Sequence, residues 1–384
     1  MQNAAGSGGS TTGPIGGSNS GGAGTNAGAS SGEAGTAGQP VGGTPAAGGA
    51  SSGGAPAGGG ASTGGGTAGA GGAATSDGFR VEGRFLYDRC NQKVVLRGVN
   101  EMVVWSPGKD GVPEFAEIAK TGANAVRIVW NEEGSAAELD VAIDNAVAAQ
   151  LIPMVEHHSA TGKLDLVPTV VQYWTQADVV AVLREHQAHL LLNIANEAGD
   201  DKVTAEAFES TYTAAIQAIR AQGVKAPLII DAPSWGQDID RLQASGPKLL
   251  AVDKNLMFSV HMWWSDPQGT RVKTELQQSV DAGLPLIVGE FAQHAVYQCD
   301  QAPFAYSVLL DEAKKHEIGW LAWSWGSVPN NDCKEMGRFD MTSDGMFGNW
   351  TGTWASDVAV DHPNGIKNSS VRPTPLTSAA CILK

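Results

Sequence analysis

The segment Leu-Leu-Leu-Asn-Ile-Ala-Asn-Glu, residues 190–197, is an apolar run that ends in a carboxylate. A second segment, Pro-Leu-Ile-Val-Gly-Glu-Phe at 285–291, repeats this pattern and places Glu290 directly after its apolar run. Short continuous apolar runs are typical of strands that are buried on both faces. Because an ionised carboxylate is costly to bury without a partner, two glutamates at such strand ends indicate a functional site.

Similar apolar runs recur along the chain and alternate with stretches of helical periodicity. After an opening hairpin at 79–87 and a turn near Asn91, we expect strands at 94–99, 124–129, 151–156, 190–195, 228–231, 257–261, 286–290 and 320–323. The helices expected between them include 112–121, 136–149, 203–222, 270–282 and 304–316. Eight strands, each followed by a helix or a long loop, predict an α/β fold, the closed (β/α)8 TIM barrel.

A doubly wound open sheet is the alternative fold. Such a sheet usually carries a glycine fingerprint after its first strand, and Gly-Val-Asn-Glu at 98–101 does not supply one. The number of expected strands therefore favours the barrel.

Residues 1–75 differ in composition from the rest of the chain. Almost all of them are Gly, Ala, Ser, Thr, Pro or Asn, and Glu33 is the only charged residue among them. Such a segment has too little apolar bulk to offset the entropy lost on ordering, so we expect a disordered, flexible linker. Residues 76–384 are expected to form one barrel domain, since about 300 residues suffice for a single large core.

The net charge of −15 restricts the partners that this protein can bind. Apart from Glu33, all acidic and basic residues lie in the expected barrel domain, which is strongly acidic. No basic patch is visible that could neutralise phosphates, so we expect neither nucleic acid nor an anionic membrane as partner. A neutral polymer such as a polysaccharide is compatible with this charge. No apolar run reaches the length of a membrane span, and we expect a monomer.

The N-terminus and the cysteines bear on where the protein acts. The chain opens with Met-Gln-Asn-Ala-Ala, without a signal segment, although a long polar tether suggests an upstream segment that exported or anchored it. We therefore expect a bacterial protein that is secreted or tethered at the cell surface. The expected disulfides are Cys299–Cys333 and Cys90–Cys381, while other pairings and free thiols remain open.

Polar side chains follow the expected strands at their C-terminal ends, where the chemistry of a barrel collects. In chain order these residues are Asn100, Arg127, His158, Asn196 with Glu197, Asp231, His261, Glu290 and Trp323. Each one alone has an ordinary structural explanation, such as an ion pair for an arginine. Together they predict a polar ring above an apolar barrel, and the two glutamates suggest the paired acids of glycoside hydrolysis.

The motifs around these residues are the landmarks of a known family. They are Leu-Arg-Gly-Val-Asn at 96–100, Thr-Gly-Ala-Asn-Ala-Val-Arg at 121–127, Glu-His-His-Ser-Ala-Thr-Gly at 156–162, Asn-Ile-Ala-Asn-Glu at 193–197, Asp-Ala-Pro-Ser-Trp-Gly-Gln-Asp at 231–238, Phe-Ser-Val-His-Met at 258–262, Val-Gly-Glu-Phe at 288–291 and Ala-Trp-Ser-Trp at 322–325. Their order resembles family 5 of the glycoside hydrolases, and within it the bacterial endo-β-1,4-mannanase branch. The resemblance extends over nearly the whole expected barrel domain, and the two glutamate motifs with His261 between them are its most specific part.

This resemblance implies a retaining hydrolysis of internal β-1,4 linkages in mannan, without a cofactor. Glu290 would be the nucleophile and Glu197 the acid/base. Arg127 would keep the nucleophile ionised, and Asn196 would bind the sugar 2-hydroxyl. The other residues that would bind substrate or support the site are Asn100, His158, Trp235, His261, Trp263 and Trp323. Of these, Trp323 would lie under the sugar at the cleavage point, and Trp235 either one subsite away or in ordinary loop packing.

Three positions depart from the family pattern. Glu101 stands where a histidine is usual, Trp263 where a tyrosine is usual, and Ala198 follows the acid/base motif in place of Pro or Trp. Neither carboxylate is lost, but the preferred substrate is left open. A β-1,4-glucanase with the same mechanism is one alternative, and a non-catalytic carbohydrate-binding protein on the same scaffold is another.

No metal site is expected from the sequence. His157 and His158 are adjacent, so on a strand they face opposite ways and cannot chelate one ion together. No His-Glu-x-x-His motif or cysteine cluster is present, and no Gly-x-Ser-x-Gly motif supports a serine nucleophile.

Overall fold

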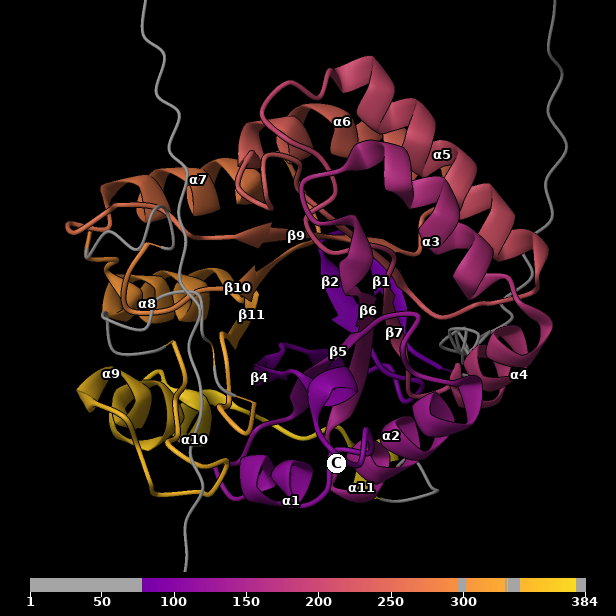
Figure 1. Ribbon diagram of the computed structural model, residues 1–384. Coiled ribbons are helices and arrows are strands. Elements are labelled where there is room, and N and C mark those ends of the chain that lie inside the picture. The colour runs from indigo at the N-terminus through magenta and orange to yellow at the C-terminus, as the bar shows by residue number, and fades with distance from the viewer. Residues whose placement is uncertain (1–77, 296–301, 329, 331–338, 378–384) are drawn as a thin grey trace, which may run out of the picture. The chain divides into compact units, whose positions relative to one another are not determined.

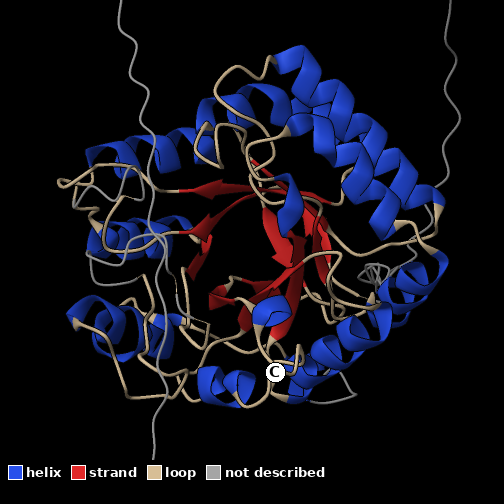
Figure 2. Cartoon of the chain, in the orientation of Figure 1, coloured by secondary structure: helices blue, strands red, loops and turns tan. Residues whose placement is uncertain are grey.

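The computed structural model of the protein describes residues 78–295, 302–328, 330 and 339–377. Eight parallel strands close into a barrel with helices around it, which confirms the predicted TIM barrel (Figures 1 and 2). In barrel order they are β10 (Leu286–Glu290), β11 (Gly319–Ala322), β4 (Arg97–Glu101), β5 (Ala125–Trp130), β6 (Ile152–His157), β7 (Leu191–Asn193), β8 (Leu228–Asp231) and β9 (Leu256–His261). The predicted linker lies outside the described residues and stays a prediction.

The first expected strand, 94–99, is divided between two sheets. Lys93–Val94 form β3, which pairs with β2 (Phe85–Tyr87), and β2 pairs with β1 (Arg80–Glu82) in a small antiparallel sheet. Only Arg97–Glu101 enter the barrel as β4. The single-strand prediction was wrong because one apolar run serves both sheets, and its periodicity does not mark the break. The predicted opening hairpin is confirmed by β1 and β2.

The small sheet packs against one end of the barrel interior. Its apolar side chains form one core cluster with inward-facing residues of the barrel strands. The side chains from the small sheet and its flank are Phe79, Val81, Leu86 and Val94, and those from the barrel include Ala125, Ile152, Met154, Leu191, Ile229, Met257, Ile287 and Leu321. This cluster fills the barrel at the end where the strands begin. The barrel is therefore a packed core, and only its other end is available for a site.

The helices of the outer ring cover the strands and bury a second apolar cluster between the two layers. Their bounds are α1 (Glu114–Ala119), α2 (Ala136–Ala148), α3 (Val167–Trp174), α4 (Ala177–His186), α5 (Ala205–Ala221), α6 (Ile239–Val252), α7 (Thr270–Asp281) and α8 (Tyr306–His316), followed by α9 (Thr353–Ser356), α10 (Ile366–Ser369) and α11 (Thr374–Thr377). Short one-turn segments η1 (Val103–Trp105), η2 (His158–Ala160), η3 (Leu164–Leu166) and η5 (Asp357–Asp361) lie in the loops.

Helices α3, α4 and α6 were not among the predicted ones. The α3 sequence is rich in valine and aromatic residues, which have modest helix propensity, and α6 contains Pro247. Burial of apolar side chains stabilises such helices despite their modest propensity. In α3, for example, Val170 and Trp174 are buried in the core shared with the barrel.

Two further features of the described residues bear on the sequence predictions. Cys90 is buried and disulfide-bonded. Cys299, Cys333 and Cys381 lie outside the described residues, so the proposed pairings stay predictions. Within the part of the chain that the structure describes, no helix is both long and apolar enough to cross a membrane.

Candidate active site

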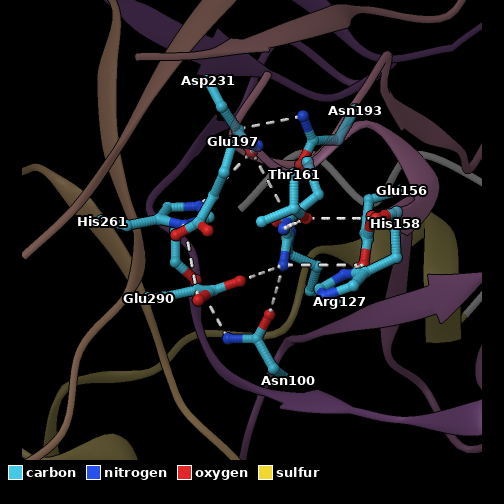
Figure 3. A network of polar contacts seen from close by, with 12 residues as sticks. Asn100, Arg127, Glu156, His158, Thr161, Asn193, Glu197, Asp231, His261 and Glu290 are labelled. Atoms are coloured by element: carbon cyan, nitrogen blue, oxygen red, sulfur yellow. Dashed lines mark hydrogen bonds and ion pairs between the residues drawn. The ribbon is translucent and has the colours of Figure 1, made fainter. Parts of the chain in front are cut away.

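A cleft of about 900 Å³ lies at the C-terminal end of the barrel. Its lining residues are His158, Thr161, Asn196, Glu197, Asp201, Ser234, Trp235, Gln237, Asp238, Trp263, Arg271, Glu290, Trp323, Asn330 and Phe339. This lining includes seven of the ten site residues that the sequence predicts. The other three, Asn100, Arg127 and His261, are fully buried: Arg127 and His261 contact lining residues, and Asn100 accepts a hydrogen bond from Arg127 (Figure 3). All ten predicted residues thus meet at one end of the barrel.

Arg127 is the centre of the polar network. It lies inside β5 and not at the strand end, so its expected position was wrong, but its long side chain reaches the site. The guanidinium donates hydrogen bonds to oxygens of Asn193 (3.0 Å), Asn100 (3.0 Å), Glu290 (2.7 Å), Asn196 (2.7 Å) and Asp231 (3.4 Å) (Figure 3). A planar group with five N–H donors suits such a set of acceptors, whereas a lysine has three.

Glu290 ends β10 and is almost completely buried. One carboxylate oxygen accepts from Arg127, and the other accepts from Nε1 of Trp263 at 3.3 Å. Trp263, which stands where the resemblance implies a tyrosine, therefore still supplies a donor to this carboxylate. Burial raises the pKa of Glu290 to about 7, although the Arg127 charge acts in the opposite direction.

Glu197 faces Glu290 across the cleft. Its backbone has a positive φ of 46°, and its N–H donates to Asp231 at 3.1 Å, which holds this strained conformation. Its Oε1 lies 2.7 Å from Nδ1 of His261. Burial, together with the negative charges of Glu290 and Asp231, raises the pKa of Glu197 well above its ordinary value. This environment favours the protonated carboxyl group.

Two glycines make the space that His261 occupies. A Cβ on Gly236 would lie 2.7 Å from Cγ of the imidazole, and a Cβ on Gly289 would lie 2.8 Å from its Nε2. Burial and the nearby Arg127 charge hold the pKa of His261 well below its usual range. The imidazole is therefore neutral, and its contact with Glu197 is a hydrogen bond between two neutral groups when that carboxyl is protonated.

The two glutamates and His261 form a compact triad. One carboxylate oxygen of each glutamate and one ring nitrogen of the histidine lie within 4.8 Å of one another. Among the described residues, these three side chains are the group that could also hold a metal ion. A metal site at this place was not expected from the sequence. The guanidinium of Arg127, 2.7 Å from Glu290, disfavours a second cation at this place.

Sequence reasoning missed several residues of the network. Asn193, Glu156 and Thr161 were not proposed as site residues, and Asp231 was noted only as a strand end. In the structure, Asn193 donates to Asp231 at 3.0 Å, and Thr161 accepts from Asn196 at 2.9 Å. These contacts position the amides and carboxylates around Arg127.

Glu156 supports His158, whose Nδ1 lies 2.7 Å from its carboxylate. Burial lowers the pKa of His158, but the charge and the hydrogen bond of Glu156, together with the charge of Glu290, outweigh it, and the net shift is upward. His158 itself lies in η2, just beyond the end of β6. Strand alternation was the signal that could have found this carboxylate, because it is two residues after the inward-facing Met154.

Aromatic side chains form part of the cleft wall. Trp323 is mostly buried, stacks on the ring of His158 at 6.0 Å, and donates from Nε1 to Asn330 at 3.0 Å. Trp235 is 43% exposed and lies over Gly162, so it is not packed into a loop core as the alternative explanation required. Both rings are open to a ligand in the cleft.

The other two departures lie outside the polar network. Glu101 is buried, accepts a hydrogen bond from Ser327, and does not line the cleft. Burial raises the pKa of Glu101 to about 8. Ala198 is buried and forms an antiparallel bridge with Thr161.

The comparisons with known proteins agree with this geometry. The family described as Cellulase (glycosyl hydrolase family 5) matches residues 87–328, more than half of the chain. A mannan endo-1,4-beta-mannosidase of Cellvibrio japonicus is 28% identical over 78% of this chain and 70% of its own length, and one of Streptomyces lividans is 33% identical over 66% and 67%. A mannotriose complex of Thermomonospora fusca beta-mannanase is 28% identical, with a TM-score of 0.69 over 78% of this chain and 99% of that one. The chain belongs to glycosyl hydrolase family 5 and is a glycoside hydrolase.

Proposed function

We propose that the protein hydrolyses internal β-1,4 linkages of mannan-type polysaccharides and retains the anomeric configuration. The observation that carries this proposal is the approach of Glu197 and Glu290, whose nearest oxygens are at most 4.8 Å apart. Retaining enzymes hold their two carboxyl groups about 5–5.5 Å apart, whereas inverting enzymes need roughly 6.5–9.5 Å to admit a water molecule.

In the first step, the Glu290 carboxylate attacks the anomeric carbon while Glu197 donates its proton to the departing glycosidic oxygen. In the second step, Glu197 removes a proton from water, and the resulting hydroxyl group displaces Glu290 from the sugar. The first step therefore needs an ionised Glu290 and a protonated Glu197. The charge of Arg127 beside Glu290, and the anionic neighbours of Glu197, favour the required distribution.

This assignment predicts the pH dependence of hydrolysis. Activity rises as pH passes the pKa of Glu290, because the nucleophile must be ionised. It falls at higher pH as Glu197 loses its proton. The substrate contacts proposed for Asn196 and Trp323 are a hydrogen bond to the 2-hydroxyl and an apolar face beneath the sugar.

Mannan is proposed as substrate because the curated relatives in the comparisons are named mannan endo-1,4-beta-mannosidases. The name of the matching family, Cellulase, keeps β-1,4-glucan as the second candidate. The complete network around both carboxylates disfavours the third possibility, a non-catalytic carbohydrate-binding protein.

The test compares reducing-sugar release from mannan and from carboxymethyl-cellulose, with E290A as the inactive control. We expect faster release from mannan, a first product of retained configuration by NMR, and no hydrolysis by E290A. Faster release from carboxymethyl-cellulose would show that β-1,4-glucan is the preferred substrate. An inverted product would contradict the retaining mechanism. Glycan binding without hydrolysis by the wild-type protein would overturn both the substrate and the mechanism.

We further propose that the protein acts outside the cell as a monomer, secreted or tethered at the bacterial surface. The linker composition of residues 1–75 and the size of a polysaccharide, which must be degraded outside the cell, support this proposal. Activity in the culture medium or on intact cells, and a monomeric mass by light scattering, are the expected results. Activity found only after lysis would contradict it.

A further inference from the structure

The segment at 339–341 is hydrogen-bonded to the backbone beside the end of β11 and forms a support there. The N–H of Ser324 donates to the carbonyl of Phe339 at 3.0 Å, and the N–H of Met341 donates back to the carbonyl of Ser324 at 2.8 Å. Asp340, between these two residues, is almost completely buried. Its carboxylate is therefore held at a fixed place next to the residue that follows Trp323.

Asn330 links this support to the indole of Trp323. Its Oδ1 accepts from Nε1 of Trp323 at 3.0 Å, and its Nδ2 donates to Asp340 at 2.6 Å and to Oγ of Ser324 at 2.9 Å. The backbone N–H of Asn330 also donates to the Asp340 carboxylate at 3.3 Å. Both ends of the amide thus have a partner.

The chemistry of the two partners determines which side chain fits between them. An indole N–H can only donate, and a carboxylate oxygen accepts. An amide offers one acceptor and one donor group, so these partners fix its orientation as well as its identity. An aspartate at position 330 would place an acceptor against the acceptor of Asp340.

The position of the Trp323 ring matters because it lines the cleft on the same side as His158, on which it stacks. A ring that supports a sugar must lie flat beneath it, and a small misplacement at a reacting centre is costly. We propose that Asn330 is a positioning residue which, held by Asp340, orients Trp323 beneath the sugar at the cleavage point; this inference rests on the proposed function.

The same segment also contacts the other side of the site. Phe339 packs edge-on against Trp263 at 5.5 Å between ring centroids, and Trp263 donates to Glu290. The residues at 339–340 therefore support both the ring under the sugar and the donor to the proposed nucleophile.

The experiment exchanges donor and acceptor between the two positions. N330D should lower kcat/KM on mannan by about 10- to 100-fold, mainly through kcat, because two acceptors face each other and the ring shifts. In the double variant N330D/D340N, the carboxylate introduced at position 330 accepts from both the indole and the amide introduced at position 340, so we expect recovery to within about threefold of wild type. N364D is the matched control, since Asn364 donates to Asp311 at 2.8 Å in the same kind of pair, away from the cleft; its activity should be unchanged.

Each outcome is decisive. Wild-type kcat/KM in N330D, or a folded double variant that stays as slow as N330D, overturns the inference. If N330D does not fold, D340N is the second variant: it removes the acceptor that orients Asn330, and an unchanged kcat/KM would overturn the inference. Absence of hydrolysis by the wild-type protein would instead overturn the proposed function.

Discussion

The two ends of the barrel are built from the same strands but hold different chemistry. At the end where the strands begin, inward-facing residues such as Met154 and Leu191 form an apolar cluster with the small sheet. Two residues further along the same strands, Glu156 and Asn193 belong to the polar network. Two residues along a strand, one full period of its alternation, thus separate an apolar layer that stabilises the fold from a polar layer that is costly to bury.

Two buried arginines show what this difference means. Arg97, at the start of β4, donates to backbone carbonyls of Leu96 and Ile318, and burial lowers its pKa to about 9. Arg127 is equally buried, but the surrounding carboxylates outweigh burial and raise its pKa. The first arginine closes backbone hydrogen bonds, whereas the second holds the side chains of the proposed reaction centre.

Replacing these arginines by lysine tests the comparison with the largest expected effect. R127K should lower kcat/KM by about 100- to 1,000-fold, because an ammonium group cannot reach the acceptors that the guanidinium orients. R97K should lower the unfolding temperature and leave the kcat/KM of the folded enzyme unchanged. Steady-state kinetics and thermal unfolding of both variants measure the two effects. An equal loss of kcat/KM in both variants would contradict the assignment of Arg97 to the fold and Arg127 to the reaction centre.

Leucine-to-alanine substitution in the apolar layer gives the next largest effect. L191A should lower the free energy of unfolding by about 2–5 kcal/mol, the usual result of a cavity in a buried core. N193A, two residues away, should cost less stability but reduce activity, since Arg127 loses an acceptor. Denaturant titration and kinetics separate the two variants, and a larger activity loss in L191A would break the comparison.

Charge coupling across the cleft predicts a smaller, spectroscopic effect. E290Q removes a negative charge that raises the pKa of Glu197, so the pKa of Glu197 should fall toward its ordinary value. The carboxyl resonance of labelled Glu197, followed by NMR against pH, measures this shift. An unchanged titration would show that the charge of Glu290 does not contribute to the pKa of Glu197.

The smallest effect is expected at Trp263. W263F removes the N–H that donates to Glu290 at 3.3 Å and keeps an aromatic ring beside Phe339. A single hydrogen bond of this kind is worth about 0.5–1.5 kcal/mol, so kcat/KM should fall by roughly 2- to 10-fold. A loss of kcat/KM as large as that of R127K would show that the Trp263 indole contributes as much to activity as Arg127 does.

Much of the site could be predicted because several of its residues directly follow apolar runs. Glu197 and Glu290 stand out as carboxylates after buried strands, and motif order identified His261 and Asn196. Asn330 could not be found in this way, since it lies in a loop and its partner Asp340 is also outside any strand. Contacts between loops leave no periodic signal in the chain.

Strand pattern and motif order alone determined the barrel, the family and the two candidate carboxylates, because hydrophobic alternation and motif spacing are local properties of the chain. Only the tertiary structure decided that Arg127 reaches the site from inside a strand, and that two glycines make room for His261. It also decided which glutamate favours its proton, since a pKa depends on burial and on charges contributed by strands far apart in sequence.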